Sequence, residues 1–129
     1  MTHWWSKPAA GDIVWCYFPT PNPKPRPVLV MSVFEEDAPN YEVRVAYGTS
    51  QKTNRLFSGE FAIRKMEHAA AFAAAGLSFD TKFDLREIEE LPFNSNYFSP
   101  PPNPRFGNHP KLGILHPSMM TAAQAAYAA

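Results

Sequence analysis

Apolar and polar residues alternate with a period of two along several parts of the chain, a pattern that is typical of β-strands. Residues 12–18 (DIVWCYF) alternate between two largely apolar faces, which predicts a strand covered on both sides. Residues 27–34 (PVLVMSVF) predict a central strand, with a proline at its start, where a missing N–H is best tolerated. Residues 41–49 (YEVRVAYGT) alternate again. The acidic, turn-prone segment 35–40 before them predicts an antiparallel hairpin.

Beyond the hairpin, strand-like and helix-like patterns of residues alternate along the chain. Residues 58–63 (SGEFAI) predict a shorter strand. The strong helix formers in 65–75 predict a helix that ends at Gly76. Residues 77–85 return to alternation and predict a further strand, with one face made of Leu77, Phe79, Thr81, Phe83 and Leu85.

The prolines divide the chain into three parts. Seven of the fourteen lie at or before residue 39 and seven at or after residue 92, so regular structure is least interrupted between them. We expect one domain over 1–129, with a barrel core at about 10–91 and an irregular proline-rich extension at 92–110. Residues 111–129 should add a short strand and a closing helix with Ser118 as its N-cap. The whole predicts a mainly β fold, a small and strongly bent antiparallel barrel with a middle and a C-terminal helix.

Composition and charge narrow the classes of function. Hydrophobic residues make up 45% of the 129 residues and charged residues 19%, as in ordinary globular proteins. The 12 basic and 12 acidic side chains balance, which argues against a nonspecific, salt-driven nucleic-acid binder. No apolar run approaches the roughly 20 residues that span a bilayer. The N-terminus lacks the features of a secretory signal, so we expect a soluble, cytoplasmic protein with no membrane partner.

Conventional catalytic signatures are absent from the sequence. It contains no glycine-rich phosphate loop, no paired cysteines and no nucleophile-elbow motif. The four histidines are scattered without ligand-like spacing, so we predict neither a metal site nor a cofactor. The single cysteine, Cys16, alternates within a predicted strand and is expected to be a buried thiol in a reducing compartment.

A polar pair is predicted at the open end of the hairpin. Counting outward from the turn, Arg26 lies eight positions before Phe34 and Thr49 lies eight positions after Tyr41, so antiparallel register places Arg26 opposite Thr49. Arg26 offers fixed donors and a permanent charge that suit a phosphodiester, and Thr49 offers a hydroxyl. The same spacing also fits a structural arginine beside an ordinary strand-end turn.

Four segments in this order resemble the PemK/MazF family of bacterial toxins. They are GDIVWCYF at 11–18, a proline-rich loop, RPVLVMS at 26–32, and AYGTSQ at 46–51. The resemblance covers roughly residues 10–90. It implies an SH3-like barrel of the CcdB/MazF type, usually a homodimer. The alanine-rich segment 69–75, the proline-rich stretch 93–110 and the C-terminal helix exceed the family's minimal barrel.

The resemblance also implies a function. Members are typically metal-independent endoribonucleases that cut single-stranded mRNA at short sequences and are neutralised by an antitoxin protein. It places the catalytic arginine on Arg26 and the catalytic threonine on Thr49. In this chemistry the RNA's own 2′-OH attacks the adjacent phosphorus and leaves a 2′,3′-cyclic phosphate and a 5′-OH. The loop 19–25 would wall the RNA groove, and Trp15, Tyr17 or Tyr47 would stack bases. The candidate RNA-binding residues are Trp15, Lys24, Ser50, Gln51, Lys82 and Asp84.

Two further hypotheses stay open. The segment NYFSPPPNPRF (96–106) also suits a noncatalytic SH3-like binding module that recruits a protein partner. The other hypothesis is a toxin of this fold that inhibits growth by acting on a protein target, such as a topoisomerase. The aromatic residues of the predicted strands also fit an ordinary core.

Overall fold

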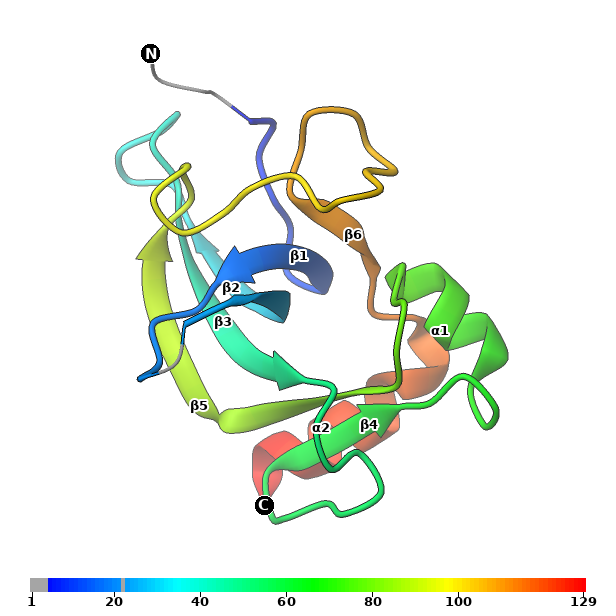
Figure 1. The fold of residues 1–129 in the computed structure, drawn as a ribbon. Helices are drawn as coiled ribbons and strands as arrows, with labels where there is room; N and C mark the ends of the chain where they lie inside the picture. The colour runs from blue at the N-terminus through cyan, green and yellow to red at the C-terminus, as the bar shows by residue number, and fades with distance from the viewer. Residues whose placement is uncertain (1–4, 22) are drawn as a thin grey trace.

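The computed structural model describes residues 5–21 and 23–129, and these residues form a mainly β fold (Figure 1). The elements, in chain order, are β1 (Asp12–Tyr17), β2 (Pro25–Phe34), β3 (Glu42–Thr49), β4 (Glu60–Ile63), α1 (Ala69–Ala75), β5 (Thr81–Pro92), β6 (Lys111–Ile114), the 3-10 helix η1 (Pro117–Met119) and α2 (Met120–Ala128). None of the helices in this described part of the chain is long and apolar enough to cross a membrane.

The strands form a six-stranded sheet in the order β4-β5-β3-β2-β1-β6, and every pair of neighbours is antiparallel. The sheet curls into a half-barrel, with β4 and β6 at its two edges (Figure 1). The predicted hairpin of β2 and β3 lies at its centre. The prediction of a bent antiparallel sheet with a middle and a C-terminal helix is therefore confirmed.

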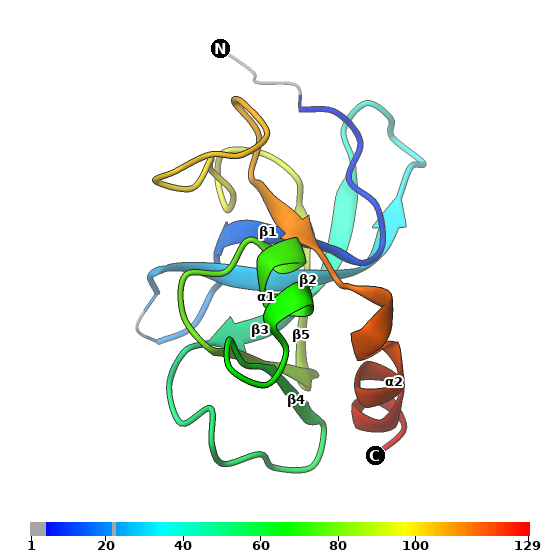
Figure 2. The same ribbon diagram turned by 90° about the vertical axis from the view of Figure 1, so that its right-hand side faces the viewer.

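Each face of the sheet carries its own hydrophobic core. The first core joins Ile13 and Leu29 of the strands to residues of α1 and α2. Both helices lie on this side, with α1 against β6 and α2 against β4 and β5 (Figure 2). The second core is built around Val28 and Val45, with no helix residue in it. Since Ile13 and Val14 are both fully buried, β1 is covered on both faces, as its sequence predicts.

The extension 93–110 belongs to the second core rather than lying on the surface. Phe93 and Phe98 are buried in that core, and Phe98 forms an isolated antiparallel bridge with Cys16. In Figure 1 this yellow-to-orange segment arches over β1. The segment is irregular, as predicted, and these two aromatic side chains help to build the core instead of lying on the domain surface or being free for a partner.

The strand expected at 77–85 begins later and runs further. β5 starts at Thr81 because turn chemistry occupies the residues before it. The Asp80 carboxylate accepts a hydrogen bond from the Lys65 backbone N–H at 2.7 Å, and the Thr81 hydroxyl donates to the Phe79 carbonyl at 2.8 Å. Phe79 is 72% exposed instead of lying on the apolar face. The strand continues beyond the predicted end at residue 85, through a charged stretch, to Pro92.

The helix starts also differ from the prediction. α1 begins at Ala69 rather than near residue 65, because the Arg64 N–H donates to His68 Nδ1 at 3.0 Å in a preceding turn. Gly76 ends the helix in the left-handed conformation, as predicted. Ser118 is not an N-cap. The side chain of His116 accepts the Ser118 N–H at 3.1 Å and caps η1, and α2 follows at Met120.

Gly48 permits the close pairing at the centre of the sheet. A Cβ atom added at Gly48 would lie 2.1 Å from the Pro27 carbonyl oxygen. We expect Gly48→Ala to lower the free energy of unfolding by about 1–3 kcal/mol, because a backbone atom cannot move aside easily. Ser50→Ala, two residues on and exposed, should change it by less than about 0.5 kcal/mol. Urea denaturation of both variants measures this, and equal midpoints would contradict the expectation.

Candidate functional site

A cavity of about 350 Å³ lies where the open end of the hairpin meets β1, the turn after α1 and the extension. We call it the rim cavity. Its lining residues include most of the residues that the sequence singled out, namely Trp15, Lys24, Arg26, Thr49 and Ser50. Its other walls come from 76–79 and 101–103. Among the described residues, two cationic residues and no carboxylate line it, so this lining suits an anionic ligand.

The register of the hairpin brings Arg26 and Thr49 to this cavity. Val28 pairs with Tyr47, and continuing this pairing by two residues places Arg26 across from Thr49. The predicted register is therefore correct at the open end of the hairpin. A bulge between Val30 and Ser32 shifts the pairing by one residue, but only in the part of the hairpin nearer the turn. There Phe34 pairs with Glu42 rather than with residue 41.

Arg26 is a buried cation with unused donor capacity. It is 6% exposed, and its Nη1 donates to the Tyr47 hydroxyl oxygen at 2.5 Å. The guanidinium also lies 4.6 Å from the centre of the Tyr47 ring. Its buried Nε has no hydrogen-bond partner, and it forms no ion pair with any carboxylate in the described residues. A buried charge without a counter-ion is unfavourable, so this guanidinium is suited to receive an anion.

Thr49 keeps a hydrogen to donate. Its Oγ1 accepts the backbone N–H of Gln51 at 3.1 Å, which fixes the hydroxyl oxygen at the strand end. Because the hydroxyl has one O–H donor in addition to its lone pairs, it can still donate to a phosphate oxygen. Ser50 lines the cavity beside it, whereas Gln51 is exposed and is not among the lining residues.

Trp15 and Lys24 complete the predicted group at the cavity. Trp15 pairs with Pro27 across β1 and β2, and its side chain packs against the first core. Lys24 is exposed at the end of the proline-rich loop. One residue of the loop that was predicted to wall the groove, Asn22, lies outside the described residues.

Lys82 and Asp84 are not brought to the rim cavity. Lys82 is 5% exposed, and its Nζ lies 3.0 Å from both the Glu60 carboxylate and the Arg55 carbonyl oxygen. Its charge is therefore already paired. The Asp84 carboxylate accepts the Arg86 N–H at 2.9 Å. Neither residue lines the cavity, so their predicted contact with RNA finds no support in its geometry.

Sequence reasoning missed Glu87, because this residue lies in a bulge of β5 that the sequence does not indicate. Ala46 pairs with Ile88, but the next residue, Tyr47, pairs with Asp84, so residues 85–87 have no partners in β3. Glu87 lies in this bulge, next to Ile88, which packs on the first core; it is exposed and is not among the residues that line the rim cavity. Nothing in the sequence of this charged stretch marks the bulge.

The Arg26 charge is one of four influences on the pKa of Glu87. Burial raises the pKa of the Glu87 carboxyl above its ordinary value, and the Asp84 charge raises it further. The Arg26 guanidinium lowers the same pKa, and Glu89 adds a smaller upward shift. A carboxyl group whose pKa is shifted toward neutrality can act as a proton acceptor.

Cys16 is a buried thiol, as predicted. Its backbone pairs with that of Arg26 across β1 and β2. Burial raises its pKa to about 12, against the opposing effect of the Arg26 charge. The thiolate is the reactive form, so Cys16 is inert at neutral pH.

This protonation state has a direct chemical test. In the native protein at pH 8 we expect Ellman's reagent to leave Cys16 unlabelled, because the thiol is both protonated and inaccessible. In denaturant one thiol per chain should react at once. Rapid stoichiometric labelling of the folded protein would contradict the assignment.

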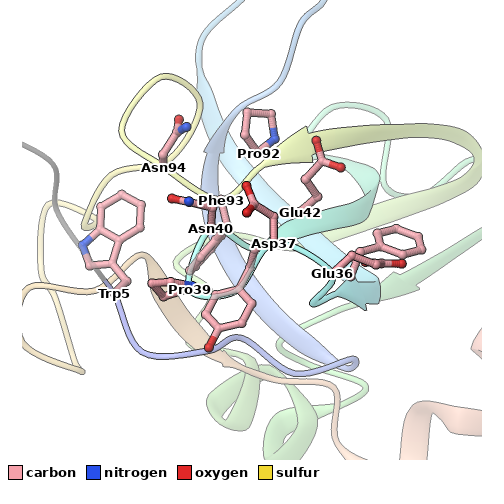
Figure 3. A pocket seen from close by; sticks show the side chains of 11 residues that line it. Trp5, Glu36, Asp37, Pro39, Asn40, Glu42, Pro92, Phe93 and Asn94 are labelled. Carbon is pink, nitrogen blue, oxygen red and sulfur yellow. The ribbon is translucent and has the colours of Figure 1, made fainter.

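A second cavity, of about 360 Å³, lies at the turn end of the same hairpin. Figure 3 shows Trp5 on one side of it and Glu36 and Glu42 on the other, with Asp37 between them. Within the part of the chain that the structure describes, three carboxylates and no basic residue line this cavity, which makes its lining unfavourable for a polyanion. No group of three or more His, Cys, Asp or Glu side chains within 5–21 and 23–129 is placed to hold a metal ion.

Comparison with known proteins adds no identification to this geometry. No protein-family model matches the chain, and no curated protein matches it either.

Proposed function

We propose that this protein is an endoribonuclease that cuts single-stranded RNA by metal-independent attack of the RNA's own 2′-OH, as its resemblance to the PemK/MazF toxins implies. The observation that carries the proposal is the buried, unpaired guanidinium of Arg26 across the strand pair from Thr49. The curled antiparallel sheet is compatible with the SH3-like barrel of that family. Within the proposal, the protein is the growth inhibitor of a type II toxin–antitoxin pair, acts in the cytoplasm as a homodimer and is held inactive by an antitoxin.

The proposed reaction assigns each group one task. The 2′-oxygen forms a bond to phosphorus, the bond from phosphorus to the 5′-oxygen breaks, and a cyclic phosphate remains. Arg26 stabilises the extra negative charge on the pentacovalent phosphorus, and Thr49 donates a hydrogen bond to a nonbridging oxygen. Glu87 lies outside the rim-cavity lining, but the Arg26 charge acts on its pKa, and we assign it the proton of the 2′-OH; water supplies a proton to the departing 5′-oxygen. Arginine is too basic to be the proton acceptor itself.

Removing the Arg26 charge tests the proposal most directly. Purified protein is incubated with a long single-stranded RNA in EDTA, and the new 5′ ends are mapped. We expect Arg26→Ala to lower the cleavage rate by about 10²–10³-fold, the usual loss when a donor to a transition-state oxyanion is removed. Arg26→Lys should also be impaired, because a lysine keeps the charge but loses the planar fork.

Arg44 provides a matched control for this experiment. Its side chain is 43% exposed and pairs with Glu90 outside the rim cavity. Arg44→Ala should therefore cut RNA at nearly the wild-type rate, since exposed ion pairs contribute little to stability. Cleavage that survives Arg26→Ala unchanged would show that a contaminating nuclease, or another site, does the cutting.

The pH dependence tests Glu87. A proton acceptor works only when ionised, so the rate should rise with pH through the pKa of Glu87, which lies above the ordinary glutamate value. Glu87→Gln should lower the rate and remove this acidic limb. Glu89→Gln removes one of the charges that raise the pKa, so it should keep activity and move the limb to lower pH. An identical pH profile for all three proteins would exclude Glu87 as the base.

A noncatalytic binding module is the alternative hypothesis. The structure reduces the surface available for it, because Phe98 and Pro101 of the proline-rich segment are buried. A protein partner that still binds after Arg26→Ala, with no RNA cleavage by the wild type, would favour the module. Growth inhibition by the wild type without loss of RNA would favour a protein target instead.

A further inference from the structure

Phe79 is a large apolar side chain held in an exposed position beside the rim cavity. It is 72% exposed although its neighbour Leu77 is buried in the first core. The turn that carries it is fixed by the two hydrogen bonds of Asp80 and Thr81 described above. A phenylalanine that lines a cavity without being buried leaves part of its ring open to a ligand.

A second wall of the cavity is also anchored by hydrogen bonds. It is formed by 101–103, where Pro101 is buried and Asn103 is exposed. Before it, the Ser99 N–H donates to the Trp15 carbonyl at 3.4 Å. After it, Arg105 Nη1 donates to the Ala73 carbonyl at 2.9 Å. The extension is thus tied to β1 on one side and to α1 on the other, so the cavity has two fixed walls.

The chemistry of the lining points to one class of ligand. Phe79 and Trp15 provide aromatic surface, whereas Ser78 and Asn103 provide hydrogen-bond donors and acceptors. Lys24 adds a positive charge, and no carboxylate opposes it. A cavity of about 350 Å³ is at the small end of the range for ligand sites. Aromatic stacking, polar contacts to base edges and a nearby cation are how proteins hold the bases of single-stranded RNA.

We propose that the rim cavity binds one nucleobase, stacked on Phe79, of the nucleotide whose phosphate is held by Arg26 and Thr49. The inference rests on the proposed function and adds to it a source of sequence selectivity. Ser78 and Asn103 read the edge of the base, because their side chains are the exposed polar groups on the two walls. The turn after α1 and the proline-rich extension then have a shared role in choosing the cleavage site.

Binding and cleavage are measured separately to test this. The four ribonucleoside 3′-monophosphates are titrated into the protein, and binding is followed by NMR shifts of the Trp15 indole. At least one base should bind, and Phe79→Ala should weaken it by about 10- to 100-fold, as expected for the loss of one base–aromatic stack. Phe57→Ala is the matched control, because Phe57 is 61% exposed but does not line the cavity. Asn103→Ala should broaden the range of bases bound, and its exposed position makes it a second variant that retains the fold.

The outcomes separate this inference from the nuclease proposal. If the wild type cuts RNA and Phe79→Ala cuts the same sites at the same rate, the base site is wrong and the nuclease stands. If the wild type binds nucleotides through Phe79 but cuts no RNA, the base site stands and the nuclease is wrong. Failure of all four nucleotides to bind overturns the inference, as does a proline-rich peptide that alone shifts the Trp15 signal.

Discussion

Strand β3 is paired along both edges, with β2 on one side and β5 on the other, and the placement of every candidate group depends on this double pairing. On the β2 side, the pairing of Val28 with Tyr47 sets Arg26 beside the tyrosine ring and across from Thr49. On the β5 side, the bulge next to Tyr47 leaves residues 85–87, with Glu87 among them, without partners in β3. Gly48 allows this arrangement, because any larger residue would meet the Pro27 carbonyl.

The burial of Arg26 lowers the stability of the fold but leaves a cation available to an anionic ligand. A guanidinium that is 6% exposed and without a carboxylate partner in the described chain loses much of its hydration. The Tyr47 hydroxyl and ring compensate for part of that loss. Lys82 shows the contrasting arrangement two strands away, where an equally buried cation is fully paired with Glu60 and a carbonyl oxygen. An unpaired buried cation is a site prepared for an anion, whereas a paired one is part of the framework.

The two cavities at the ends of the hairpin carry opposite charges, although the net charge of the protein is zero. The rim cavity has Lys24 and Arg26 in its lining, and the cavity at the turn has three carboxylates. The balance of 12 basic and 12 acidic residues conceals this separation. An anionic ligand would be attracted to one end of the hairpin and repelled from the other.

The sequence by itself determined the central hairpin, the two helices and the opposition of Arg26 and Thr49, because these depend on local alternation and on counting from one turn. It did not determine the course of β5, because the side chains of Asp80 and Thr81 delay its start and a three-residue bulge breaks its alternation. Only the tertiary structure decided that the Arg26 charge lowers the pKa of Glu87, that Lys82 forms a buried ion pair with Glu60, and that Phe79 is exposed at a cavity. These placements arise from contacts between segments far apart in the chain, and no local pattern in the sequence records such contacts.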